Sequence, residues 1–285
     1  MKIAVTGAGG KAGRAVLQDL LAHGHEVRAV DVTGAPGDRG ELWHELGTPL
    51  LRADLTDFGD TVDALTGMDG VVHLAAIPAP GYFTDARTLN VNNAINGNVF
   101  LAAAKMGLSR VVFASSETAL GFPFAPDAPP RYLPVDEAHY PIALSTYALS
   151  KVVGETMAEH ISGWSGIPIV SLRLSNIHTT ADYPNLPGYW NDPLTRVFDL
   201  WGYIDDRDVA QACRRALLAD VTGARSYVIA AHDTLMNRPT ADLVKEVFPD
   251  VPLNRPLEGH ESVLDITKAR EELGFAPEHS WREML

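Results

Sequence analysis

Tyr147 and Lys151, four residues apart, are the pair of side chains in this sequence best suited to transfer a proton. On a helix, residues at this spacing share one face, with about 5 to 6 Å between their Cβ atoms. A phenol with a pKa near 10 gives up its proton at neutral pH only where a positive charge stabilises the phenolate, and the lysine ammonium supplies such a charge. An isolated pair of this kind is usually part of an exposed helix face, so its meaning depends on the surrounding motifs.

The segment 6–13 has glycines at positions 7, 10 and 13, and it directly follows the apolar run 3–5. Glycines at this spacing between a strand and a helix allow a sharp turn, a close approach of the backbone to a pyrophosphate, and tight packing of the helix on the strand. Amides at the start of the helix then meet the phosphates. The pattern predicts a dinucleotide site, with Lys11 and Ala12 also in contact with the cofactor.

Asp31 ends the predicted second strand, 27–31, and lies 18 residues after Gly13. A carboxylate there accepts hydrogen bonds from the adenosine ribose and repels a 2'-phosphate, so we expect NAD rather than NADP. A solvated turn aspartate is the alternative, and Arg28 and Arg39 keep NADP open.

Strand-like and helix-like segments alternate over the first 172 residues, which is typical of a parallel sheet covered on both faces. Further strands are predicted at 50–54, 71–76, 110–114 and 167–172, and long helices at 85–106 and 143–164. We expect an α/β fold with a doubly wound parallel sheet (Rossmann fold) over 1–176. A small mixed lobe over 177–285, partly integrated with that domain, is expected to close the substrate pocket. We place in the lobe helices near 206–219 and 238–247 and a strand at 227–230.

The composition excludes several classes of partner. The net charge is −13 and there is no run of Lys and Arg, so neither nucleic acid nor an anionic membrane is expected as a partner. No apolar stretch approaches the roughly 20 residues of a membrane span, and the N-terminus begins a strand rather than a signal peptide, so we expect a cytoplasmic protein. Cys213 is the single cysteine, and we expect neither a disulfide nor a metal site.

Several motifs together resemble, in order and spacing, the extended short-chain dehydrogenase/reductases, the NAD-dependent epimerase/dehydratase group. They are the glycines 7, 10 and 13, Asp54-Leu55, the segment 73–76, Asn92, Ser115-Ser116, Tyr147 with Lys151, and the segment 172–176. The segments 203–210 and 265–274 also look like carboxy-terminal signatures of the group, so the resemblance covers nearly the whole chain.

This resemblance implies a role for each matching residue. Tyr147 is expected to act as acid and base, Lys151 to hold the nicotinamide ribose and lower the tyrosine pKa, and Ser116, with Thr118 as the alternative, to hydrogen-bond the reacting oxygen. Asn92 belongs either to a proton relay or to a backbone bend beside it. The remaining expected cofactor contacts flank the adenine or line the adenosine side, and they are Asp54, Leu55, Leu74, Ala75 and Ala76.

The departures from the family pattern bear on the substrate. Glu117 stands where sugar-nucleotide dehydratases tend to carry an Asp, but Thr118 replaces the following acid, so dehydration is not expected. The run 113–116 followed by Gly121-Phe122, with the short lobe, looks closest to the uronate dehydrogenase branch, although residues 117 and 118 differ from it. Arg131, Arg173 and His178 are candidates to meet a substrate carboxylate.

The resemblance therefore implies an oxidoreductase that moves a hydride between a secondary alcohol carbon of a small carbohydrate-like substrate and NAD. One alternative is a nucleotide-sugar epimerase that retains its NAD, and another is a non-catalytic NAD-sensing regulator. Relatives in this family pair through two long helices, so a homodimer through 85–106 and 143–164 is expected.

Overall fold

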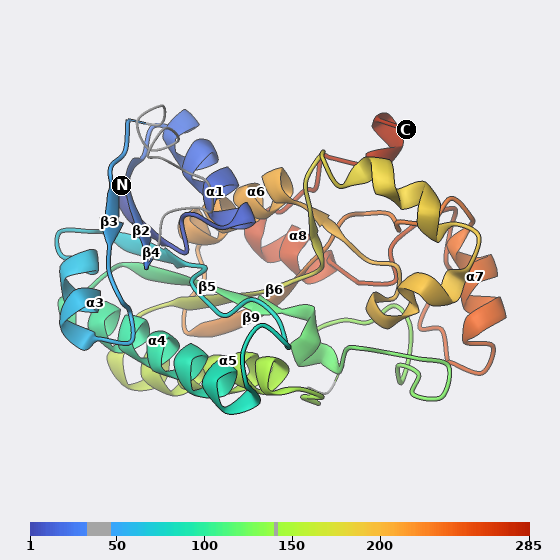
Figure 1. Cartoon of the computed structure of the whole chain (residues 1–285), viewed down its shortest axis with the longest axis horizontal. Helices are drawn as coiled ribbons and strands as arrows, with labels where there is room; N and C mark the ends of the chain where they lie inside the picture. The colour runs from blue at the N-terminus through green and yellow to red at the C-terminus, as the bar shows by residue number, and fades with distance from the viewer. Residues whose placement is uncertain (33–46, 140–141) are drawn as a thin grey trace.

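A seven-stranded parallel sheet forms the centre of the protein (Figure 1). The structure, a computed structural model, describes residues 1–32, 47–139 and 142–285. The strands lie in the order β3-β2-β1-β4-β5-β6-β9. Their bounds are β1 (Lys2–Thr6), β2 (Glu26–Asp31), β3 (Leu50–Arg52), β4 (Gly70–His73), β5 (Arg110–Ser116), β6 (Ile169–Leu174) and β9 (Ala224–Ile229). The predicted doubly wound α/β fold is confirmed.

Helices cover both faces of the sheet (Figure 1). One face carries α1 (Lys11–Ala22), α6 (Asp206–Leu218) and α8 (Thr267–Leu273), and the other carries α3 (Phe58–Leu65), α4 (Asp85–Met106) and α5 (Thr146–Ser165). Strands buried on both sides need continuous apolar runs, and the four residues of β4 are all buried. Within the described residues, no helix is long and apolar enough to cross a membrane.

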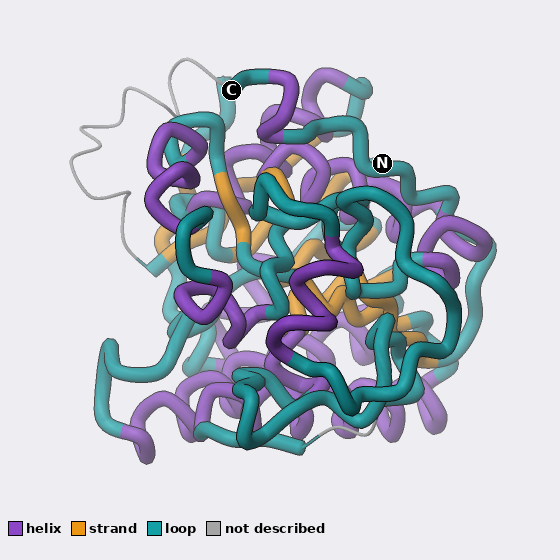
Figure 2. The backbone as a smooth tube through the Cα atoms, turned by 90° about the vertical axis from the view of Figure 1, so that its right-hand side faces the viewer, coloured by secondary structure: helices purple, strands orange, loops and turns teal. Residues whose placement is uncertain are grey.

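Short elements of the carboxy-terminal half lie beyond the carboxyl ends of the strands. They are β7 (Ile177–His178), which pairs with β8 (Ile204–Asp205), the 3-10 helices η2 (Tyr183–Tyr189) and η3 (Pro193–Asp199), and α7 (Thr240–Val247). We call this group of elements the lobe. Figure 2 looks at this end and shows loops and short helices in front of the strands.

Two segments that we expected in the lobe belong to the main layers instead. The strand expected at 227–230 overlaps β9 (Ala224–Ile229), which pairs with β6 at the edge of the central sheet. The helix expected at 206–219 is α6, which packs on α1 and is tied to it by an ion pair of 2.7 Å between Arg214 and Asp19. The placement of these two elements was therefore wrong, because they bury their apolar faces against the sheet layers rather than over the strand ends.

A buried ion pair joins α5 to the centre of the sheet. Glu155 on α5 and Arg173 on β6 approach to 2.9 Å, with side chains only 14% and 8% exposed. The Ser115 hydroxyl donates to the same carboxylate at 2.5 Å. The Ser226 hydroxyl on β9 donates to it as well, at 3.2 Å, so three strands and one helix meet at one carboxylate, one turn beyond Lys151.

We predict that Glu155→Ala lowers the free energy of unfolding by about 3 to 5 kcal/mol, because the substitution leaves the Arg173 guanidinium buried without its partner. Urea denaturation measures the change. Glu159→Ala, an exposed site one turn further along α5, is the matched control and is expected to stay within about 0.5 kcal/mol of the parent protein. Equal losses in the two variants contradict the prediction.

Candidate active site

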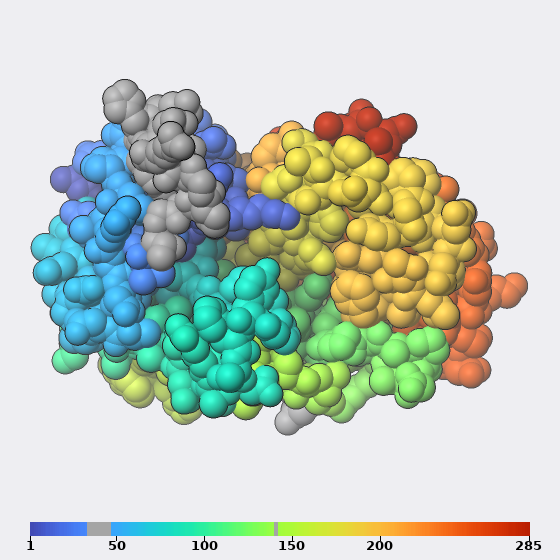
Figure 3. All heavy atoms as spheres, in the orientation of Figure 1, coloured from blue at the N-terminus to red at the C-terminus, as the bar shows by residue number. Residues whose placement is uncertain are grey.

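A cavity of about 1060 Å³ opens at the carboxyl ends of the strands, where ligands bind in sheets of this type. Its walls come from the glycine segment after β1, the ends of β2, β4, β5 and β6, the start of α5, and Phe198 of the lobe. Figure 3 shows the amino-terminal layers, blue to teal, and the lobe, yellow to orange, on opposite sides of the molecule. A space of this size accommodates a dinucleotide together with a small second molecule.

The glycine segment is packed so closely that side chains cannot enter it. Gly7 has a φ of +68°, and a Cβ added to it would lie 2.7 Å from the backbone nitrogen of Ala75. A Cβ on Gly13 would lie 2.2 Å from the Gly7 carbonyl oxygen. The Gly9 amide donates to the Asp31 carboxylate at 2.9 Å, which joins the loop to the end of β2. These contacts fit the cradle that a pyrophosphate requires.

Every residue that the sequence predicted as a cofactor contact lines this cavity. They are Gly7, Gly10, Lys11, Ala12, Gly13, Asp31, Asp54, Leu55, Leu74, Ala75, Ala76, Tyr147 and Lys151. Arg28, in contrast, is outside the lining, and its guanidinium donates to the carbonyls at the end of α3, at 2.9 Å for Thr66. Arg39 lies outside the described residues.

The start of α5 places the phenol and the amine. The Ser145 hydroxyl accepts from the Ala148 amide at 3.1 Å and so caps the turn that carries Tyr147. One turn later, the buried Lys151 ammonium donates to the Ala114 carbonyl at 2.7 Å and lies 5.4 Å from the centre of the Tyr147 ring. The predicted neighbourhood of the two side chains is present.

Burial opposes charge on both groups. It lowers the pKa of Lys151 to about 8, against the carboxylate of Glu155, which raises it. Burial raises the pKa of Tyr147 to about 12. A hydrogen bond with Ser116 acts to lower this pKa, and the charge of Glu117 acts to raise it. The chain alone therefore keeps the phenol protonated at neutral pH.

Ser116 and its alternative Thr118 both line the cavity. Ser116 ends β5, its hydroxyl accepts from the Thr118 amide at 3.2 Å, and its side chain reaches Tyr147. The Thr118 hydroxyl is buried and has no hydrogen-bond partner among the described residues. Contact with the phenol favours Ser116 as the group beside the reacting oxygen.

Asn92 is buried behind the cavity and does not line it. Its side chain accepts from the Ile77 amide at 2.8 Å and donates to the Ile77 carbonyl at 3.2 Å and to Ser150 at 3.1 Å. Of the two roles expected for Asn92, a proton relay or a backbone bend, this geometry fits the second, because the side chain holds the backbone bend after β4.

Three basic groups considered for a substrate carboxylate, Arg131, Arg173 and His178, are absent from the lining among the described residues. Arg173 is engaged by Glu155. His178 is buried beside Tyr203, and burial, with the charge of Arg196, lowers its pKa to about 4. Neither Arg173 nor His178 offers a cation to the cavity at neutral pH.

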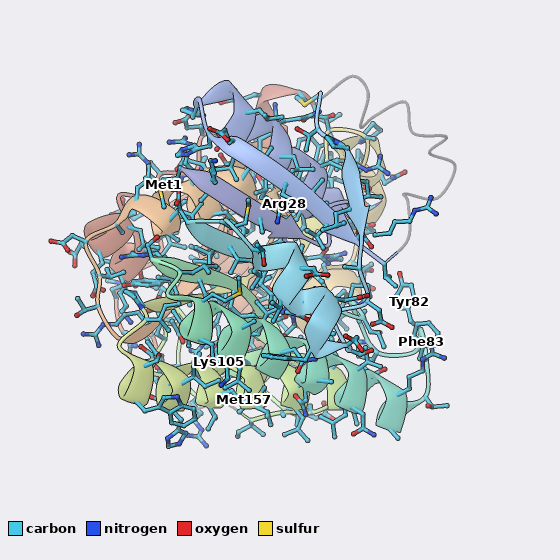
Figure 4. All side chains as sticks on the ribbon, turned by 90° about the vertical axis from the view of Figure 1, so that its left-hand side faces the viewer. Met1, Arg28, Tyr82, Phe83, Lys105 and Met157 are labelled. Carbon is cyan, nitrogen blue, oxygen red and sulfur yellow. The ribbon has the colours of Figure 1, made fainter. Side chains whose placement is uncertain are left out.

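Two features of the site had no signal in the sequence. The first is a buried ion pair between Arg196 and Asp199 on η3, which lies behind Glu117. The second is an exposed aromatic pair on the loop before α4, Tyr82 and Phe83, with the Arg87 guanidinium 4.2 Å over the Phe83 ring (Figure 4). Neither arises from a motif, because each depends on how loops fold over the cavity.

The sequence matches a known protein family and is similar to several named enzymes. The model of the NAD dependent epimerase/dehydratase family matches residues 3–186. The chain is 30% identical to an NAD-dependent glucose-6-phosphate dehydrogenase of Haloferax volcanii over 66% of this chain and 74% of that one. It is 30% identical to an L-arabinose 1-dehydrogenase (NAD(P)(+)) of the same organism over 81% and 89%.

A uronate dehydrogenase of Pseudomonas syringae is 26% identical over 72% of this chain and 70% of the other. Among solved structures, a short-chain dehydrogenase/reductase superfamily protein from Agrobacterium tumefaciens with bound NAD superposes with a TM-score of 0.75. That superposition covers 100% of this chain and 95% of the other at 22% identity, so it establishes the fold.

We predict that Gly13→Ala weakens NAD binding at least about 10-fold, because the new methyl group forces the Gly7 carbonyl out of the cradle. Isothermal titration with NAD measures the affinity. The control is Gly163→Ala in α5, where an added Cβ meets nothing within 4 Å. Parental affinity in Gly13→Ala contradicts the prediction.

Proposed function

The chain belongs to the NAD-dependent epimerase/dehydratase family and is an NAD-dependent enzyme of the short-chain dehydrogenase/reductase type, and we propose that it oxidises a secondary alcohol carbon of a small sugar. The convergence of Ser116, Tyr147 and Lys151 on the cavity that the glycine segment borders carries this proposal. A phenol, an amine and a hydroxyl at one point are the groups that proton transfer at a carbinol requires.

Each of the three side chains has a distinct task in this mechanism. Ser116 holds the reacting oxygen by a hydrogen bond, and the Tyr147 oxygen takes the hydroxyl proton during oxidation. Lys151, fixed by the Ala114 carbonyl, lies beside the ring of the phenol and would hold the nicotinamide ribose. NAD, when bound, supplies the hydride acceptor and a further positive charge. The glycine segment, Asp31 and the loop after β4 would hold its dinucleotide portion.

The relatives support a sugar as the substrate. The names of the three relatives described above are those of dehydrogenases of a sugar, a sugar acid or a sugar phosphate. In this chain the cavity continues past the glycine segment to Asn176 and Phe198, which leaves room for a small molecule beside the phenol. Ile177 and Phe198 of the lobe line the cavity on that side.

A homodimer through α4 and α5 is part of this proposal. These helices pack on each other and carry large apolar side chains at the surface. Leu149 is 39% exposed and Trp164 is 69% exposed. A second copy that covers this face would remove those side chains from water.

An NADH-fluorescence screen over aldoses, hexuronates and nucleotide sugars tests the function. We expect net NADH to accumulate with a small sugar, whereas an epimerase that retains its cofactor accumulates none.

Tyr147→Phe removes the proton acceptor and is expected to lower kcat/KM at least about 10²- to 10⁴-fold while NAD affinity stays within about threefold. Turnover near the parental rate in this variant contradicts the assignment of Tyr147 as the proton acceptor.

Asp31 generates a prediction about cofactor choice. We expect a preference for NAD over NADP of at least about 100-fold in kcat/KM, because a 2'-phosphate would meet the carboxylate at close range. Asp31→Ala also loosens the Gly9 contact, which affects both cofactors alike, so the ratio is the informative quantity. A ratio that does not fall in this variant refutes the role of Asp31.

A further inference from the structure

One wall of the cavity carries polar atoms that the fold leaves unsatisfied. We call this the polar wall and define it as Glu117, Thr118, Ser175 and Asn176, all of which line the cavity. Glu117 is 8% exposed, and one of its carboxyl oxygens has no hydrogen-bond partner among the described residues. The Thr118 hydroxyl is buried and unpartnered in the same part of the structure, and the Ser175 hydroxyl lies beside Glu117. Buried polar atoms normally have a partner, so unpartnered ones grouped at one cavity wall indicate a polar ligand.

The wall has no cation to offer. Behind it, Asp199 is 1% exposed and pairs with Arg196, which neutralises the guanidinium. Burial and the nearby charge of Asp199 raise the pKa of Glu117 well above its usual range. The basic side chains of the lining among the described residues are Lys11, Arg87 and Lys151, and none of them belongs to the polar wall. Lys11 pairs with Asp182, Lys151 donates to the Ala114 carbonyl, and the exposed Arg87 lies over the Phe83 ring.

We propose that the polar wall, through Glu117, selects neutral polyhydroxylated sugars and excludes those that carry a carboxylate or a phosphate. This inference rests on the proposed oxidation of a small sugar and names its substrate class. A sugar hydroxyl both donates and accepts, so it satisfies a carboxyl oxygen and a neighbouring serine or threonine hydroxyl together. A substrate anion would lose its water at a wall without a countercharge.

The position of Glu117 makes this selection effective. It directly follows Ser116, and its charge acts on the pKa of Tyr147, so it lies within reach of a sugar whose carbinol is bound at those two residues. A hydroxyl near the reacting carbon therefore meets Glu117.

The experiment compares kcat/KM for glucose, glucuronate and glucose 6-phosphate, and for galactose and galacturonate, with NAD in excess. For the parent protein we expect a neutral sugar to exceed its matched anion at least about 100-fold. Glu117→Gln keeps the shape and replaces a group that can carry negative charge with a neutral amide that donates to anions. It is expected to reduce this ratio at least about 10-fold.

A structural role for Glu117 would lower the rates for all substrates together and leave the ratio unchanged, and that result overturns the inference. Glu137→Gln is the control, because its carboxyl is also partly buried but accepts from the Val228 amide and lies outside the cavity lining. Its ratio is expected to match that of the parent protein.

If Glu117→Gln does not fold, the substrate preference of the parent protein tests the inference by itself. Oxidation of an acid or a phosphate as fast as the matched neutral sugar overturns the inference while the proposed oxidation of a sugar stands. If no sugar of any class yields NADH, the proposed function fails, and the inference fails with it.

Discussion

Lys151 is an amine buried at the end of the central sheet, and the surrounding structure holds it there. An ammonium removed from water is stable only where hydrogen bonds and opposite charge replace its hydration. The Ala114 carbonyl accepts from it, and the carboxylate of Glu155 raises its pKa against burial. Glu155 in turn needs Arg173 on β6, so the alignment of β5, β6 and α5 is tied to this one charge.

Burial also determines how far the chain itself can lower the pKa of Tyr147. Lowering the pKa of Tyr147 from about 12 to about 7 requires about 7 kcal/mol at 1.36 kcal/mol per unit. The Lys151 ammonium is already in place in the structure in which the pKa of Tyr147 is about 12, so this stabilisation has to come from outside the chain, from a bound cation. A phenol that stays protonated until then does not act as a base before the site is complete.

Local spacing predicted much of this site, and long-range packing explains what it did not predict. The glycine segment, Asp31 and the pair Tyr147 and Lys151 each lie within a turn or one strand-helix unit, so their geometry follows from period and propensity. The helix predicted over 85–106 has those bounds as α4, whereas α5 begins at Thr146 because Ser145 caps it. The lobe was harder to predict, because the sequence of the strand expected at 227–230 does not show which strand it pairs with. In the structure this strand belongs to the central sheet, where β9 pairs with β6.

The polar wall and the phenol share one electrostatic environment, and this links recognition to chemistry. Glu117 acts to raise the pKa of Tyr147, and Asp199 acts to raise the pKa of Glu117. Any ligand group that accepts the Glu117 proton, or donates to its unpartnered oxygen, therefore changes the charge felt by the phenol. Ser116 directly precedes Glu117 in the chain and contacts the phenol, so a substrate bound at Ser116 lies beside both groups. A motif search finds Ser116 and Tyr147 but not this coupling, because Asp199, on a 3-10 helix, lies 82 residues after Glu117 in the sequence.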